Sequence, residues 1–162
     1  MEPIASSFRD PSGFLFKRDN LVYRMVNHSY AEDYECLMNS GLYGKLTERG
    51  LMLPHVEQGL DDGKACYKVI KPEQLEYVSY PYEWSFSQLK DSAALTLKIQ
   101  LLAMEHGMTL KDASAYNVQL HQGKPVFIDT LSFEKYVEGS PWVAYRQFCQ
   151  HFLAPLALIS HC

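Results

Sequence analysis

The first half of the chain alternates short apolar stretches with polar turns, as β-strands and their connections do. The apolar stretches predict strands at residues 14–16, 21–26, 51–54 and 66–70. The first two flank the polar residues 17–20 and predict a β-hairpin. The last two flank a polar loop that carries the turn pair Asp62-Gly63. Helical spacing of apolar residues replaces this pattern after Pro81.

Three helical regions are predicted. Ser29, with Glu32 three residues later, has the pattern of a capping box and predicts a helix start. Gly41 and Gly44 interrupt this region, so it is either one kinked helix or two short ones. Another helix is predicted from Ser140-Pro141, because the first helical turn tolerates proline well.

The clearest helix starts after Ser85, whose capping-box partner is Gln88, and ends at Gly107. A helix of about 20 residues spans roughly 30 Å, enough to support a whole lobe. Its apolar stripe is predicted at Phe86, Leu89, Ala93, Leu97, Leu101 and Met104. An aromatic cluster lies where the two halves join and favours a shared core over an adenine pocket; its members are Tyr80, Tyr82, Trp84 and Phe86.

Composition supports a folded α+β protein. Of the 162 residues, 47% are hydrophobic and 13% aromatic, which is ample for a buried core. We expect a β-rich part over residues 1–82 and a helical part over residues 83–162. The formal net charge is −4 and basic residues do not cluster, which argues against nucleic-acid binding.

The chain shows no sign of a membrane span or a disulfide framework. No apolar stretch approaches the roughly 20 residues that a spanning helix needs. The four cysteines are widely spaced, with no CxxC pair, and no secretory leader is visible, which favours reduced thiols and a cytoplasmic location. The six histidines are equally scattered, which argues against a zinc site.

Three polar residues form the best candidate site. Asp112 follows the long helix, Asn117 comes five residues later, and Asp129 ends the apolar stretch 125–128. A second hairpin, with strands at 118–120 and 125–128, would bring Asn117 and Asp129 together. Oxygen ligands of this kind suit Mg²⁺, and a further carboxylate can orient an attacking hydroxyl. The alternative is structural, because Asp and Asn commonly shape turns.

This arrangement resembles the active-site segment of kinase-like small-molecule phosphotransferases, including the aminoglycoside phosphotransferases. The resemblance covers residues of about 80 to 152. It implies a reduced, protein-kinase-like fold with two lobes, with ATP and Mg²⁺ in the cleft between them. It also implies that Asp112 is the catalytic base and that Asn117 and Asp129 are the metal ligands.

A second resemblance covers nearly the whole chain. The sequence from Ser79 to Asn117, together with residues 127–133, is similar to a region of certain bacterial S-adenosylmethionine-dependent methyltransferases, some of them related to nodulation. In those proteins this region precedes the catalytic domain. It implies a fragment of a longer protein, with a C-terminal methyltransferase domain as partner. S-adenosylmethionine would bind beyond Cys162, since no glycine-rich methyl-donor turn is present here. The apolar stretch 153–159 would pack against that further sequence.

The chain departs from the kinase-like pattern in three ways. Leu110 stands where a histidine usually precedes the catalytic aspartate, and no glycine-rich phosphate loop is present. The lysine that anchors ATP has no clear counterpart. Arg24 is the best substitute, with Glu32 or Glu35 on the following helix as its ion-pair partner. Arg24 and Glu35 are therefore the predicted cofactor-binding residues.

Three hypotheses follow for the function. The first is a degenerate, nucleotide- or metal-binding kinase-like domain at the start of a methyltransferase-type protein. The second is an active phosphotransferase that uses ATP and Mg²⁺ on a small hydroxyl substrate such as a sugar. The third is a docking module in which Asp112, Asn117 and Asp129 are only structural. The missing histidine and glycine-rich loop favour the first hypothesis over the second, and the retained polar residues favour it over the third.

Overall fold

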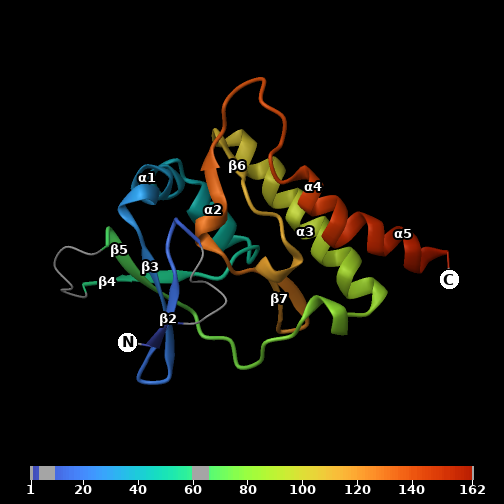
Figure 1. Ribbon diagram of the computed structural model, residues 1–162, viewed down its shortest axis with the longest axis horizontal. Helices are drawn as coiled ribbons and strands as arrows, with labels where there is room; N and C mark the ends of the chain where they lie inside the picture. The colour runs from blue at the N-terminus through green and yellow to red at the C-terminus, as the bar shows by residue number, and fades with distance from the viewer. Residues whose placement is uncertain (1, 4–9, 60–65, 162) are drawn as a thin grey trace.

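A five-stranded antiparallel sheet and a long helix organise the fold. The computed structural model describes residues 2–3, 10–59 and 66–161 (Figure 1). The strand order in the sheet is β1-β2-β3-β5-β4. The strands are β1 (Glu2–Pro3), β2 (Leu15–Arg18), β3 (Leu21–Val26), β4 (His55–Gln58) and β5 (Lys68–Pro72).

The predicted first hairpin is confirmed. Arg18 pairs with Leu21 across a two-residue turn, Asp19-Asn20, and both turn residues have positive φ, of 51° and 61°. Turns with two such residues match the twist of the flanking strands, and Asp and Asn tolerate this backbone well.

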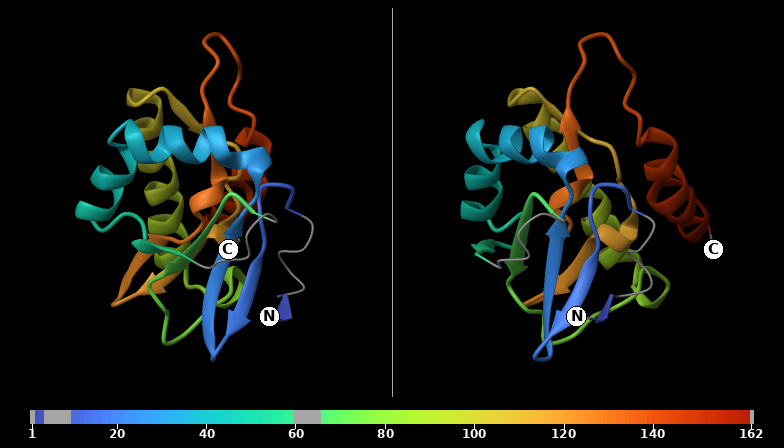
Figure 2. Two further views of the ribbon diagram at one scale, coloured as in Figure 1. Left: turned by 90° about the vertical axis from the view of Figure 1, so that its left-hand side faces the viewer. Right: turned by 60° about the vertical axis from the view of Figure 1, so that its left-hand side comes forward.

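Two short helices follow the hairpin and cross one end of the strands (Figure 2). They are α1 (Ala31–Asn39) and α2 (Leu42–Glu48), separated at Gly41, whose φ of +81° favours glycine. The predicted start at Ser29 is wrong. A 3₁₀ turn, η2 (His28–Tyr30), precedes α1, and the Ser29 hydroxyl donates to the carbonyl of Pro11 instead of capping the helix.

The predicted strand at 51–54 is also wrong. Leu51, Met52 and Leu53 are all buried, so the stretch lacks the in-and-out alternation of a surface strand. Its backbone pairs with Phe127 instead, through one parallel bridge at Met52. The first half of the chain is thereby joined to the second. The predicted turn at Asp62-Gly63 lies outside the described residues.

The long helix α3 (Phe86–Glu105) starts as predicted. The Ser85 hydroxyl accepts the amide of Gln88, and the Gln88 side chain accepts the amide of Ser85. The predicted apolar stripe is wrong in part, because four of its members are exposed: Phe86 (39%), Leu97 (42%), Leu101 (66%) and Met104 (44%). The helix is apolar on nearly every side, so periodicity alone does not tell which side is buried.

The buried side of α3 includes three polar residues that pair internally. Ser92 and Thr96 donate their hydroxyls to backbone carbonyls one turn earlier in the helix. Gln100 bonds with the hydroxyl of Thr109 and accepts the amide of Leu110. These bonds let polar side chains lie beside Ile99 in the core without unpaired groups.

Short elements complete the chain after α3. They are β6 (Met108–Leu110), η4 (Ala115–Asn117), β7 (Val118–His121), β8 (Lys124–Phe127), η5 (Thr130–Ser132), β9 (Phe133–Lys135), α4 (Tyr145–Phe148), the π-helical turn η6 (Cys149–Leu153) and α5 (Ala154–Ser160). β6 pairs with β9, and β7 pairs with β8 as the predicted second hairpin. α4 to α5 pack alongside α3 (Figure 1).

The last helical region begins later than predicted. It starts at Tyr145 rather than at Ser140-Pro141, because Trp142 is held outside the helix by a bond from its indole nitrogen to the carbonyl of Leu110.

The main core contains residues from both halves of the chain. It combines side chains of α1, α2 and the 51–52 segment with α3, Phe127, Phe133, Phe148 and Phe152. Of the aromatic cluster before α3, Trp84 alone is buried in this core, while Tyr80 and Tyr82 are exposed and stack on each other. Within the described residues, no helix is both long and apolar enough to cross a membrane.

Candidate functional site

The β7–β8 hairpin brings two of the predicted site residues together. The amide of Ile128 donates to the carbonyl of Asn117 at 2.8 Å. The Asn117 side-chain amide donates to the Ser132 hydroxyl at 3.0 Å, and that hydroxyl donates to Oδ2 of Asp129 at 2.9 Å. Asn117 and Asp129 are therefore neighbours linked through Ser132.

The carboxylate of Asp129 is fully engaged. Oδ1 accepts the amide of Leu131 at 3.0 Å and lies 3.2 Å from Nη1 of Arg24. Oδ2 accepts the Ser132 hydroxyl. The side chain is only 15% exposed, so these contacts are weakly screened by water.

Arg24 lies beside Asp129. It sits on β3 opposite Ile70, and its side chain is 11% exposed. Its Nη2 donates to Oδ2 of Asp10 at 2.7 Å, while Nη1 faces Asp129. Its Nε is buried without a partner among the described residues. One guanidinium thus bridges two carboxylates and retains an unpaired donor.

The predicted ion pair between Arg24 and Glu32 or Glu35 is wrong. Glu35 accepts the Tyr67 hydroxyl at 2.6 Å and lies 3.4 Å from the Lys68 ammonium, while Glu32 pairs with Lys135. The Tyr67 hydrogen bond, helped by Asn39 and Lys68, lowers the pKa of Glu35. Both glutamates lie on the outer side of α1, whereas the Arg24 side chain faces Asp10 and Asp129. The rotation of α1 about its axis therefore keeps the glutamates away from Arg24.

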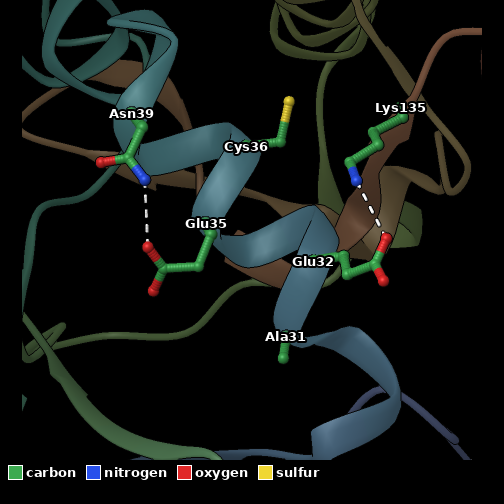
Figure 3. A pocket seen from close by; sticks show the side chains of 6 residues that line it. All are labelled: Ala31, Glu32, Glu35, Cys36, Asn39 and Lys135. Carbon is green, nitrogen blue, oxygen red and sulfur yellow. Dashed lines mark hydrogen bonds and ion pairs between the residues drawn. The ribbon is translucent and has the colours of Figure 1, made fainter.

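Glu35 lines a shallow depression of about 440 Å³ on the outer side of α1 (Figure 3). Its walls are formed by Ala31, Glu32, Glu35, Cys36, Asn39 and Lys135. The depression is wide open and contains none of Arg24, Asp112, Asn117 and Asp129. It is a separate surface feature from the polar site.

Asp112 lies in the loop that follows β6. Its Oδ1 accepts the amide of Ser114 at 2.9 Å, which is the turn-forming role named above as the structural alternative. Its Oδ2 has no hydrogen-bond partner among the described residues. The neighbouring amide of Lys111 donates to the carbonyl of Ser132 at 2.8 Å, which fixes the start of this loop against the segment after Asp129.

Two groups at the site were not identified from the sequence. The first is Lys111, whose ammonium donates to the Ser12 hydroxyl at 2.7 Å and lies 4.4 Å from the centre of the Tyr30 ring. The second is the segment of residues 10–13, called the strap below, which carries Asp10 and Ser12 over Arg24 and Lys111. The position of Lys111 directly before Asp112 could have indicated that Lys111 belongs to the site. No sequence pattern indicated that the strap does.

A polar network extends from the site to α1. The Thr130 hydroxyl lies 3.4 Å from Nδ1 of His55, and Nε2 of His55 lies 3.0 Å from the Tyr34 hydroxyl. Tyr34 in turn donates to Glu57. Burial lowers the pKa of His55 to about 4, although Glu57 nearby acts in the opposite direction. The ring is therefore neutral at pH 7.

As arranged, the site does not fit a divalent cation. Among the residues that the structure describes, no group of three His, Cys, Asp or Glu side chains could hold a metal. Asp129 and Asn117 could supply two oxygen ligands, but the Arg24 guanidinium lies 3.2 Å from Oδ1 of Asp129. A fixed positive charge there repels a cation and takes up the carboxylate oxygen that would bind it.

Comparison with known proteins agrees with this architecture. No family model matches the chain. The nodulation protein NoeA of Rhizobium meliloti (strain 1021) is 38% identical over 161 residues, which cover 97% of this chain and 33% of NoeA. This chain therefore spans about a third of the length of that curated relative.

Among solved structures, vaccinia related kinase 3 superposes with a TM-score of 0.51 at 13% identity, over 89% of this chain and 50% of that one. The chain has a kinase-like α+β fold. At this identity the likeness concerns the fold and not the activity.

The buried His55 should make stability depend on pH. Its pKa is about 4 in the folded chain and about 6.5 when unfolded, so the unfolded chain binds more protons between these values. The free energy of unfolding should therefore fall as pH drops from about 6.5 to about 4, by up to roughly 3 kcal/mol from this group. Urea unfolding of His55→Gln should show a flatter profile over this range, whereas the exposed-site control His161→Gln should parallel the parent. Parallel profiles for all three proteins would contradict the assignment.

The contact between Arg24 and Asp129 should show strong energetic coupling. Asp129→Leu leaves the guanidinium with Asp10 alone and should lower the free energy of unfolding by about 3 kcal/mol. The double variant Arg24→Met/Asp129→Leu should lose less than the sum of the single variants, by about 1–3 kcal/mol. The same cycle on the exposed pair Glu32 and Lys135 serves as control and should show little coupling. Additive effects at Arg24 and Asp129 would show that this contact is not a stabilising pair.

Proposed function

We propose that this chain is a degenerate kinase-like module of a larger protein. Its role is to bind a partner region or a ligand rather than to catalyse metal-assisted phosphoryl transfer. The observation that carries the proposal is the position of Arg24, 3.2 Å from the carboxylate oxygen that would hold the metal ion. Phosphoryl transfer of this type depends on cations that bridge the phosphates. Because Asp129 is bound to a guanidinium, no metal ion activates a phosphate here. Asp112 therefore has no reaction in which to act as a catalytic base.

The larger protein, in this proposal, carries a methyltransferase region that binds S-adenosylmethionine and acts in the cytoplasm. The NoeA relative is about three times as long as the matched region, and the sequence from Ser79 to residue 133 resembles methyltransferase-type proteins. Exposed apolar side chains on α3, η6 and α5 offer a surface on which another region can pack. They are Leu97, Leu101, Met104, Leu153 and Ile159.

An active phosphotransferase is the second candidate. Two observations favour it: the hairpin brings Asn117 and Asp129 together, and Oδ2 of Asp112 is unpaired among the described residues. In that case Arg24 would have to leave Asp129 before ATP and Mg²⁺ bind to the site.

Metal and nucleotide titrations separate the two candidates. A ligand at a hundredfold excess over its Kd stabilises the folded state by about 2.7 kcal/mol, so binding would raise the melting temperature clearly. We expect no Mn²⁺- or Mg²⁺-dependent rise for the parent, with or without ATP, and no ATP turnover. Arg24→Met should acquire a Mn²⁺-dependent rise, while the exposed control Arg18→Met should behave like the parent.

Two results would contradict the proposed degeneracy. One is ATP turnover by the parent that Asp112→Ala abolishes. The other is a Mn²⁺-dependent rise in the parent melting temperature that Asp129→Ala removes. Either result would favour the active phosphotransferase.

The methyltransferase companion is tested by the gene itself. We expect the reading frame that contains this region to encode a strand followed by a glycine-rich turn and a helix, the arrangement that binds S-adenosylmethionine in Rossmann-type enzymes. A full-length reading frame without such a turn would remove this part of the proposal and leave the kinase-like module unaffected.

A further inference from the structure

The strap, residues 10–13, is bound by two cations that come from distant parts of the chain. Arg24 on β3 donates to Oδ2 of Asp10 at 2.7 Å. Lys111, just before the Asp112 loop, donates to the Ser12 hydroxyl at 2.7 Å. The amide of Ser12 also donates to Oδ1 of Asp10, so the strap presents a compact group of acceptors to both cations.

These two cations are incompletely paired. Among the described residues, Lys111 has no carboxylate partner and rests on the Ser12 hydroxyl and the face of the Tyr30 ring. Arg24 is nine-tenths buried, and its Nε has no partner there. Donors left unpaired inside a protein are costly, so an anion with more acceptor oxygens than Asp10 and Ser12 would be bound favourably.

The strap is anchored mainly through its backbone. The carbonyl of Ser12 accepts the amide of Asn27, and the carbonyl of Pro11 accepts the side chains of Asn27 and Ser29. Gly13 allows this close approach, because a Cβ there would lie 1.9 Å from the carbonyl oxygen of Met25. Gly13 therefore lets the strap lie directly against β3, with Asp10 and Ser12 on Arg24 and Lys111.

The carboxylate end of the strap is its more accessible part. The Asp10 side chain is 31% exposed, whereas that of Arg24 is 11% exposed. Pro11 is exposed as well. Releasing Asp10 removes one of the two carboxylate partners of Arg24 and leaves Asp129 as the other.

We infer that the strap is a displaceable internal plug, in which Asp10 and Ser12 occupy the positions of a phosphate-bearing ligand on Arg24 and Lys111. Carboxylate and phosphate oxygens both match the donor geometry of a guanidinium, so one can replace the other. Binding of such a ligand requires the strap to lift. No metal ion is involved, so the plug goes beyond the proposed function and does not depend on whether Asp129 can bind a cation.

The test measures binding of inorganic pyrophosphate in the presence of EDTA by calorimetry. Asp10→Asn removes the competing charge and should bind pyrophosphate at least about tenfold more tightly than the parent. The control Asp19→Asn removes the same charge from the exposed β2–β3 turn and should bind like the parent. Adding Arg24→Met to Asp10→Asn should abolish binding. ADP as a second probe distinguishes a nucleotide ligand from free pyrophosphate.

Hydrogen exchange in the parent protein gives an independent measurement. Saturating pyrophosphate should speed exchange of the Asn27 amide, which donates to the strap, and leave the Ile128 amide, which donates to Asn117, unchanged. This measurement decides the matter if Asp10→Asn does not fold. The plug is overturned if Asp10→Asn binds no tighter than Asp19→Asn, if it binds no pyrophosphate, or if Asn27 stays protected in the liganded parent.

Discussion

The ion pair between Arg24 and Asp129 is the contact on which the arrangement of the whole molecule depends. It joins the middle strand of the five-stranded sheet to the segment that follows the second hairpin. A guanidinium does not lose its charge in a protein, so a buried arginine must be met by carboxylates. Holding the sheet against the rest of the chain and coordinating a cation therefore compete for the same oxygen of Asp129. In this structure the first use prevails.

Hydrogen bonds from other neighbours also hold the segment around Asp129 in place. The Tyr30 hydroxyl donates to the carbonyl of Phe133 at 2.6 Å, and burial raises the pKa of Tyr30, so the hydroxyl remains a donor. Ser132 links Asp129 with Asn117, and Thr130 contacts His55. Most polar groups that a ligand could use are instead paired within the protein; among the described residues, Nε of Arg24 and Oδ2 of Asp112 are exceptions. The polar side chains of the site are held in fixed positions, as in a binding site, but they are held by bonds to one another rather than to a ligand.

Local sequence signals were sufficient for part of this picture. The Ser85 and Gln88 capping box, the Asp19-Asn20 turn and the β7–β8 hairpin depend on neighbouring residues, so they could be predicted, and the hairpin placed Asn117 beside Asp129. The α+β class followed from the order of predicted strands and helices, and the kinase-like resemblance followed from the long helix with Asp112, Asn117 and Asp129.

Features decided by tertiary packing could not be predicted. Which side of α3 is buried depends on what packs against it, because the helix offers apolar residues on both sides. The partners of Arg24 depend on the phase of α1 and on the strap, which no local pattern places near β3. The 51–54 stretch has the composition of a strand, but its partner is a single residue far along the chain, Phe127.

That pairing with Phe127 has a consequence for how the protein is made. Leu51 and Leu53 exchange backbone hydrogen bonds with Phe127, and Met52 bridges to it. During synthesis the ribosome releases the 51–53 stretch long before Phe127 exists, so three apolar residues wait without their partner. Pairing the 51–53 stretch with Phe127 also closes a long loop of chain, which costs conformational entropy, and such non-local pairing is slow. The 51–53 stretch therefore lacks this backbone partner until the second hairpin has been synthesised.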